Sequence, residues 1–261
     1  MIPQYIILFF YFDKILEEAA KNKIDIIPLK GAHLLTAVYQ NEDRGVIADI
    51  DFMVREEDWK KIIQIMENLG FVKRELPYDE TDKHEMGFYM EIGGGKRVLF
   101  EAHQFLFSPD RFYINHKQVW ERAYHSTFDN IKCMRMSDED IFCHIAFHSA
   151  VHRFINLKRA RRDLQLILQN TSVDIAKIIE RAKEWGCRRA VWIFLDMLYK
   201  HEIINTIEPP SHIKQTLRIL VKPEKFTNIF FLHHRIQAAI IWPLIFDTKQ
   251  QLLTMLCNRP E

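Results

Sequence analysis

The chain has 261 residues, and its 36 lysine and arginine residues nearly balance 35 aspartate and glutamate residues, giving a formal net charge of +1 at pH 7. Such a charge gives no global field that would attract a long nucleic acid or an anionic membrane surface. The composition, 48% hydrophobic and 27% charged, is that of an ordinary soluble globular protein. The length allows one large domain or two modest ones.

Two further features bear on location. The apolar stretch at residues 5–12 is followed at once by a charged segment. It is too short for a membrane span and lacks the basic start and small-residue cleavage site of a signal peptide, so we interpret it as part of a core helix. The four cysteines form no CxxC pair, which favours reduced thiols. We therefore expect a cytoplasmic protein that does not associate with a membrane.

The first half of the chain alternates predicted helices and strands. Apolar residues at helical spacing predict helices over residues 4–21 and 56–69. Between them lie a short buried strand at residues 24–29, a helix that begins at Gly31, and a strand at residues 48–54. This order predicts an α+β domain with a mixed sheet backed by helices.

The second half changes character. Residues 87–92 and 97–106 read as two strands, and three consecutive glycines between them predict a hairpin. From Ser137 onward the periodicity is helical to the end of the chain. We therefore predict two domains, an α+β domain over residues 1–130 and an all-helical domain over residues 131–261.

The predicted strand at residues 48–54 carries two acidic side chains on one face. Asp49 and Asp51 are separated by one residue, so their Cα atoms lie about 6.5 Å apart on the same side of the strand. Two such carboxylates repel each other unless a cation lies near them. Oxygen ligands of this kind suit Mg²⁺ or Mn²⁺. A solvated acidic strand edge would give the same pattern without a metal.

Lys30 and Gly31 stand where the first predicted strand gives way to a helix. Backbone N–H groups at such a junction form a natural phosphate site, and Lys30 adds a positive charge beside it. A basic residue beside a glycine is also common by chance. Together with the two aspartates, however, the junction suggests nucleotide chemistry.

These motifs in sequence, Leu29-Lys30-Gly31, then Tyr39, Arg44 and Asp49-Ile50-Asp51, resemble the minimal nucleotidyltransferases of the DNA polymerase β superfamily. The resemblance covers residues 15–163. It implies that Glu101, within a predicted strand that also carries His103, joins Asp49 and Asp51 as the third catalytic and metal-binding carboxylate. It also makes Lys30, Gly31 and Arg44 the candidates for binding the nucleotide.

The resemblance implies a reaction. Nucleotidyltransferases of this kind use Mg²⁺ (or Mn²⁺) to move a nucleoside monophosphate from an NTP to an acceptor hydroxyl, with release of pyrophosphate. The acceptor is a small molecule, a protein or an RNA end, and the near-neutral charge argues against long nucleic acid. The alternative is a catalytically weak nucleotide-binding module, or a regulatory or toxin–antitoxin-type interaction protein. Ala32, where many superfamily members have serine, leaves room for this alternative.

Three histidines recur at a spacing of four in a predicted helix over residues 138–154. His144, His148 and His152 share one face of that helix. They are open to three interpretations: a metal site, part of a substrate cleft, or a polar helix face satisfied by its neighbours. The resemblance makes His148, His152 and Asp163 candidates for lining a cleft toward the nucleotide or the acceptor, and Arg162 is a further candidate for binding the nucleotide.

Overall fold

The computed structural model describes Asp247 and five segments of the chain: residues 4–39, 47–74, 84–109, 112–128 and 130–200. By their internal contacts the residues form two units, 1–109 with 115–137, and 110–114 with those from 138 onward. Arg44 and the helices predicted beyond residue 200 lie outside the described segments.

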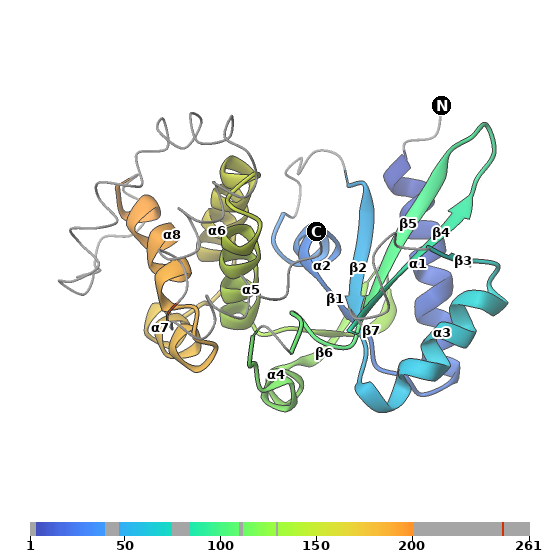
Figure 1. The fold of residues 1–261 in the computed structure, drawn as a ribbon, viewed down its shortest axis with the longest axis horizontal. Helices are drawn as coiled ribbons and strands as arrows, with labels where there is room; N and C mark the ends of the chain where they lie inside the picture. The colour runs from blue at the N-terminus through green and yellow to red at the C-terminus, as the bar shows by residue number, and fades with distance from the viewer. Residues whose placement is uncertain are drawn as a thin grey trace, which may run out of the picture. The chain divides into compact units, whose positions relative to one another are not determined.

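The first unit is built on a five-stranded mixed sheet in the order β1-β2-β5-β4-β3 (Figure 1). Its strands are β1 (Ile27–Pro28), β2 (Asp49–Met53), β3 (Val72–Lys73), β4 (Glu85–Glu91) and β5 (Arg97–His103). Its helices are α1 (Gln4–Lys21), α2 (Lys30–Ala37), the 3-10 helix η1 (Glu56–Asp58), α3 (Trp59–Asn68) and α4 (His116–Arg122). Strands β2 and β5 are parallel and the other neighbours are antiparallel, which confirms the predicted mixed sheet.

The turns follow the glycines that the sequence suggested. Gly70 takes a left-handed φ of 88° directly after α3, and Gly93, Gly94 and Gly95 all have positive φ between β4 and β5. Residues other than glycine adopt this conformation only at a steric cost. The helix predicted over residues 56–69 and the glycine hairpin are thus confirmed.

A second, two-stranded sheet was not predicted. It consists of β6 (Tyr124–Phe128) and β7 (Ile131–Arg135), joined by a turn at Asn130 with φ of 70°. The Met134 N–H donates to the Ile26 carbonyl at 2.8 Å, so the hairpin adjoins the sheet beside β1. Most of its side chains are exposed or half-buried, so the hairpin lacks the alternation of apolar and polar residues that reveals a strand.

The pleat of the sheet separates the core from the candidate site. The even-numbered residues Ile50, Phe52, Val98 and Phe100 are fully buried and belong to one hydrophobic cluster. Helices α1 and α3 cover this face, while α2 lies on the other side of the sheet (Figure 1). Because successive side chains of a strand point to opposite faces, the odd-numbered residues of β2 and β5 face away from the core. That set includes all three of the predicted metal-binding carboxylates, Asp49, Asp51 and Glu101.

The second unit is helical, with α5 (Asp138–Val151), α6 (Leu157–Asn170), α7 (Ile175–Glu184) and α8 (Arg188–Lys200). Helix α5 packs against the other three and buries Ile141, Ile145 and Ala146. It ends at Val151, earlier than the predicted residue 154, because Arg153 and Phe154 adopt left-handed φ values of 57° and 58°. The mixed sheet followed by helices confirms the predicted fold class.

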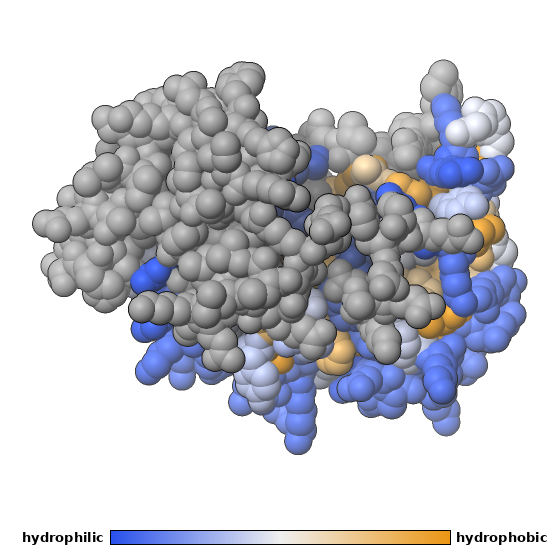
Figure 2. Space-filling view, viewed as in Figure 1, coloured by the Kyte–Doolittle hydropathy of each residue, from blue (hydrophilic) through white to orange (hydrophobic). Residues whose placement is uncertain are grey.

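Among the helices that the structure describes, none combines the length and the apolar character needed to cross a bilayer. On the face shown in Figure 2, most described surface side chains are hydrophilic, with smaller apolar areas between them. Among the large apolar side chains that are exposed, Ile6 and Phe10 lie one turn apart on α1, and the others, such as Tyr113, are scattered along the chain.

The aromatic contacts of α1 give the first prediction. Phe12 is fully buried, and its ring lies 6.0 Å from Phe52, 6.4 Å from Phe100 and 4.9 Å from Phe128. Replacing Phe12 with alanine removes contacts to three strands, so we expect the free energy of unfolding to fall by about 3–5 kcal/mol. Phe10→Ala is the matched control, because that ring is 54% exposed and its loss should cost less than about 1 kcal/mol. Urea unfolding followed by circular dichroism measures both, and equal losses would contradict the assignment of the core.

Candidate functional site

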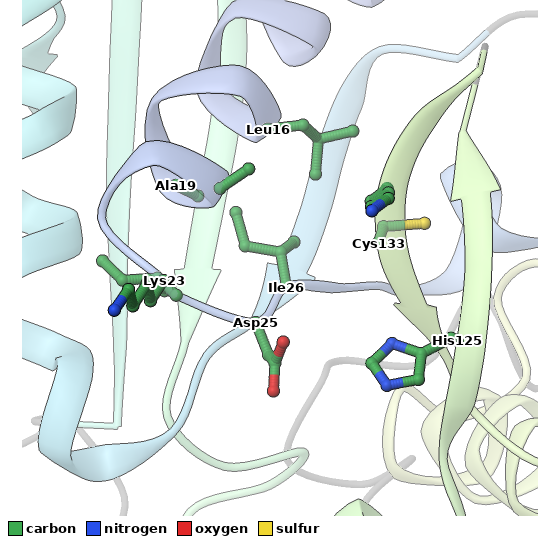
Figure 3. A pocket seen from close by; sticks show the side chains of 10 residues that line it. Leu16, Ala19, Lys23, Asp25, Ile26, His125 and Cys133 are labelled. Carbon is green, nitrogen blue, oxygen red and sulfur yellow. The ribbon is translucent and has the colours of Figure 1, made fainter.

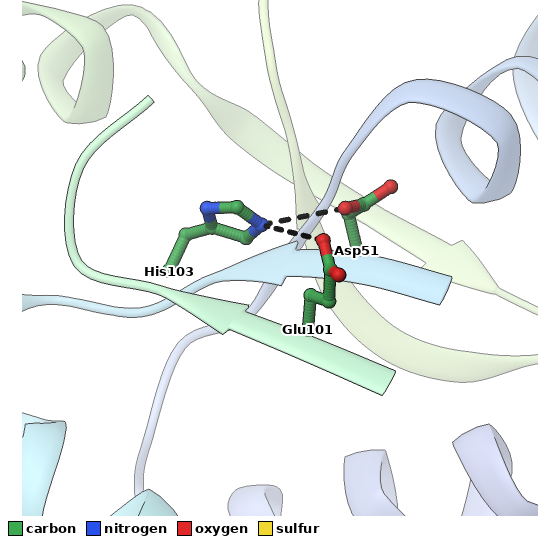
Figure 4. Close-up of side chains that lie close together, drawn as sticks. All are labelled: Asp51, Glu101 and His103. Atoms are coloured by element: carbon green, nitrogen blue, oxygen red, sulfur yellow. Dashed lines mark hydrogen bonds and ion pairs between the residues drawn. The ribbon is translucent and has the colours of Figure 1, made fainter. Parts of the chain in front are cut away.

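Strand register brings two of the predicted carboxylates together. Asp51 on β2 is the direct partner of Glu101 on the parallel strand β5, and Met53 is the partner of His103. Both carboxylates point to the face opposite the hydrophobic core, as Figure 4 shows. Glu101 therefore shares a face with Asp51.

His103 completes this cluster. Its Nε2 lies 3.3 Å from Asp51 Oδ1 and 3.9 Å from Glu101 Oε2 (Figure 4). One ligand atom from each of the three residues lies within 4.8 Å of the others. Over the described segments, this is the one group of three or more histidine, cysteine, aspartate or glutamate side chains that meets this criterion. Two carboxylate oxygens and an imidazole nitrogen suit a divalent cation, so the residues fit the metal that the resemblance implies.

Lys30 reaches the same carboxylate from α2. Its Nζ donates to Asp51 Oδ1 at 2.9 Å, and the Leu29 N–H donates to the Asp51 carbonyl at 2.8 Å. Lys30 has a φ of 42°, in the left-handed region that costs a non-glycine residue free energy and that surrounding contacts must stabilise. The strand–helix junction thus turns sharply at Lys30 and directs its ammonium to Asp51.

Lys30 thus places a positive charge of the chain itself beside Asp51. Burial acts to raise the pKa of Asp51, but the Lys30 ammonium and His103 outweigh it and hold that pKa well below its usual range. Burial likewise acts to lower the pKa of Lys30, and Asp51, with Glu101 and Asp49, raises it instead. Asp51 and Lys30 therefore both stay ionised, because each stabilises the charge of the other.

Glu101 behaves in the opposite way. Burial, strengthened by the neighbouring Asp51 carboxylate, raises the pKa of Glu101 to about 8. One carboxylate of the cluster is thus firmly ionised and the other readily holds a proton near neutral pH, because two close negative charges with a single ammonium are not fully compensated.

Asp49 occupies a different place from that of Asp51. It is half-buried two residues earlier on the same face of β2, and it acts electrostatically on Lys30. It is not a member of the three-residue cluster, in which His103 stands as the third candidate ligand. The sequence placed His103 on the same strand face as Glu101 but offered no role for it.

Glu85 on β4 lies behind the cluster. It is the register partner of His103, and its Oε2 lies 3.4 Å from His103 Nδ1 and 3.5 Å from His84 Nε2. Sequence reasoning missed Glu85. The sequence did offer one indication of it. The glycine hairpin pairs the strand that Glu85 begins with the strand that carries Glu101.

The remaining predicted residues lie in the second unit. The rings of His144 and His148 are 6.0 Å apart and those of His148 and His152 are 4.3 Å apart. His144 is buried on α5 and His152 is exposed in the turn that follows. On α6, Arg162 is exposed and Asp163 is buried. These positions do not by themselves assign a ligand to any of them.

A separate cavity of about 230 Å³ lies between the end of α1 and the β6–β7 hairpin (Figure 3). Its wall is largely apolar, with polar side chains at Lys23, Asp25, His125 and Lys132. None of the predicted site residues lines it, so it is not part of the acidic cluster.

The structure has the arrangement that the sequence motifs predicted for a nucleotidyltransferase. Acidic side chains are paired across two parallel strands of a mixed sheet, and a lysine lies at the adjoining strand–helix junction. The comparison with family models agrees: the chain belongs to a family described as uncharacterised nucleotidyltransferase, whose model matches residues 4–201. The resemblance is thereby confirmed. No protein of curated function matches the chain.

Several solved structures are similar. A nucleotidyltransferase-like antigenic protein from Paracoccidioides brasiliensis aligns with a TM-score of 0.52 and 15% identity, over 75% of this chain and 88% of that one. ANT(2")-Ia in complex with adenylyl-2"-tobramycin aligns with a TM-score of 0.44 and 14% identity, over 72% and 97%. Lincomycin-bound LnuA, a lincosamide antibiotic adenylyltransferase, gives 0.40 and 16%, over 62% and 96%. At these identities the likeness concerns the fold.

The raised pKa of Glu101 predicts how stability depends on pH. In the unfolded chain the carboxyl titrates near its ordinary value of 4.5, and in the folded protein near 8. The folded state therefore binds the extra proton, and its stability falls as the pH rises from about 4.5 to about 8. Glu101→Gln has no such proton to lose. In buffer with EDTA, we expect its melting temperature to exceed that of the wild type increasingly over this range.

The control for this prediction is the difference in melting temperature between Glu101→Gln and the wild type below pH 4.5, which should not change with pH. Parallel pH profiles of the two proteins from pH 5 to pH 8 would show that Glu101 titrates normally in the folded protein.

Proposed function

We propose that the protein transfers a nucleoside monophosphate from an NTP to an acceptor hydroxyl and releases pyrophosphate, with Mg²⁺ or Mn²⁺ as cofactor. One observation carries this proposal: Asp51 and Glu101 face each other in register on two parallel strands, in a chain of a nucleotidyltransferase family. In this proposal Asp49, Asp51 and Glu101 would hold the cation. When bound, the cation would neutralise charge on the triphosphate and the leaving pyrophosphate.

The chain's own residues would hold the triphosphate. Helix α2 begins at Lys30, and the backbone N–H groups of its first turn, including that of Gly31, have no carbonyl partner within the helix. Together with the positive end of the helix dipole they attract phosphate oxygens. Lys30 Nζ lies 2.9 Å from Asp51 in the structure. With a nucleotide bound, this ammonium would also contact a phosphate oxygen. Arg44 is proposed as a further phosphate ligand.

The acceptor hydroxyl needs a group that removes its proton. Asp51, whose pKa is held low, is a weak base. Glu101, with a pKa of about 8 in the metal-free protein, holds a proton at neutral pH and can act as a base only after it has lost that proton, at basic pH or when a bound cation displaces it. The two carboxylates would thus divide the work, Asp51 supplying constant charge and Glu101 facing the acceptor. The proposed contribution of His148, Arg162 and Asp163 to binding the nucleotide or the acceptor stays a prediction.

The experiment that tests the proposal uses the purified full-length protein with each of the four NTPs, labelled at the α-phosphate, and Mg²⁺. Small-molecule, protein and RNA fractions of a cell extract are supplied separately as acceptors. The expected result is a labelled product in one fraction and stoichiometric pyrophosphate. NTP binding without a product in any fraction would favour the nucleotide-binding module instead.

The two aspartates of β2 should separate catalysis from stability. We expect Asp49→Asn and Asp51→Asn each to lower transfer by at least about 100-fold, because each is proposed to hold the cation. Only Asp51→Asn should lower the free energy of unfolding, by about 1–3 kcal/mol, because it takes from the partly buried Lys30 ammonium the carboxylate to which it donates a hydrogen bond. Asp49→Asn is the matched control on the same strand face. Near-native transfer by the double variant would rule out the assigned site.

A further inference from the structure

We propose that His103 is a nitrogen ligand of the metal site, oriented by Glu85, and that this nitrogen makes the site prefer Mn²⁺ to Mg²⁺. The inference rests on the proposed function and deepens it by naming the cofactor. It adds an imidazole, and a second residue that orients it, to a site assigned so far to carboxylates.

The position of His103 carries the first step. His103 is the last residue of β5, and only 5% of its side chain is exposed. Its Nε2 is directed at Asp51 and Glu101, 3.3 Å and 3.9 Å away, as the dashed lines in Figure 4 show. Two ligands of one octahedral ion at about 2.1 Å lie about 3.0 Å apart when adjacent and about 4.2 Å apart when opposite. Both distances lie between these limits, so His103 Nε2 can share one cation with an oxygen of either carboxylate.

Glu85 carries the second step. Its Oε2 is 3.4 Å from His103 Nδ1, on the far side of the ring from Asp51. In the structure Nε2 is within hydrogen-bond distance of Asp51 Oδ1, at 3.3 Å, whereas Nδ1 is buried and makes no hydrogen bond. A neutral imidazole that binds a cation through the lone pair of Nε2 carries its hydrogen on Nδ1, and Glu85 Oε2 is the carboxylate oxygen placed near it. Carboxylate–histidine–metal arrangements use the outer carboxylate in this way to fix the tautomer.

The donor set then decides the metal. Mg²⁺ favours oxygen ligands, and Mn²⁺ accepts both carboxylate oxygen and imidazole nitrogen. Asp51 and Glu101 serve either ion, although Mg²⁺ gives up its water ligands reluctantly. The imidazole of His103 adds affinity for Mn²⁺ that carboxylate ligands alone do not provide.

Electron paramagnetic resonance with Mn²⁺ alone tests this on the full chain. Loss of the signal of free Mn²⁺ gives the affinity of the protein for Mn²⁺, and displacement of bound Mn²⁺ by added Mg²⁺ gives the affinity for Mg²⁺. Electron spin echo modulation detects nitrogen bonded to Mn²⁺. We expect nitrogen modulation in the wild type and a tighter affinity for Mn²⁺ than for Mg²⁺. His103→Gln should abolish the modulation and weaken Mn²⁺ binding about tenfold or more, while Mg²⁺ binding changes by less than about threefold.

Two further variants separate orientation from ligation. Glu85→Gln should keep the modulation but weaken Mn²⁺ binding about tenfold, within the range for losing the residue that orients a ligand. His84→Gln is the matched control, because His84 is also buried and lies 3.5 Å from the same Glu85 oxygen, but it is not part of the cluster. It should match the wild type in both readings.

The outcomes are distinguishable. In one outcome Asp51→Asn weakens Mn²⁺ binding, but the wild type shows no nitrogen modulation. This would overturn the role of His103 and leave the proposed function standing. This reading uses the wild type, so it does not depend on the folding of His103→Gln. In another outcome neither Asp51→Asn nor His103→Gln weakens Mn²⁺ binding, or the wild type does not bind Mn²⁺ at millimolar concentration. Either result would overturn this inference and also the metal site of the proposed function.

Discussion

The candidate site depends on how a single buried carboxylate is compensated. Asp51 is 5% exposed, and one of its oxygens accepts a hydrogen bond from Lys30 while lying 3.3 Å from His103. Burying an unpaired carboxylate would cost several kcal/mol, so these partners are a condition for the carboxylate to remain ionised there. The strained backbone of Lys30 is explained by the same requirement, because that conformation directs the ammonium at Asp51.

The alternation of the strands links this pair to the fold. The same two segments that place Phe52 and Phe100 in the core place Asp51 and Glu101 on the opposite face. Parallel pairing of β2 and β5 then sets the carboxylates side by side, and the β4–β5 hairpin brings Glu85 behind His103. A shift of one residue in the register of β5 would send Glu101 into the aromatic core, so the packing of α1 against that core also protects the site.

Much of this was predictable from sequence. Strong periodicity gave the bounds of α1 to the residue, and the alternation around Asp49 and Asp51 gave β2. The β6–β7 hairpin was missed because its exposed side chains carry no apolar alternation, and α5 ends early because Arg153 and Phe154 turn left-handed. Lys30 and Asp51 were both singled out, but their pairing across 21 residues is a tertiary contact that no local pattern encodes. The same holds for Glu85 and His103, which meet only through strand register.

The most direct test of the account follows which phosphate leaves the nucleotide. The protein is incubated with Mn²⁺ or Mg²⁺, extract, and the same NTP labelled in parallel at the α- and the γ-phosphate. The account predicts that label from the α-phosphate enters the product, that label from the γ-phosphate is recovered in pyrophosphate, and that Asp51→Asn stops both. Label from the γ-phosphate in the product, or equal transfer by Asp51→Asn, would contradict nucleotidyl transfer at this cluster.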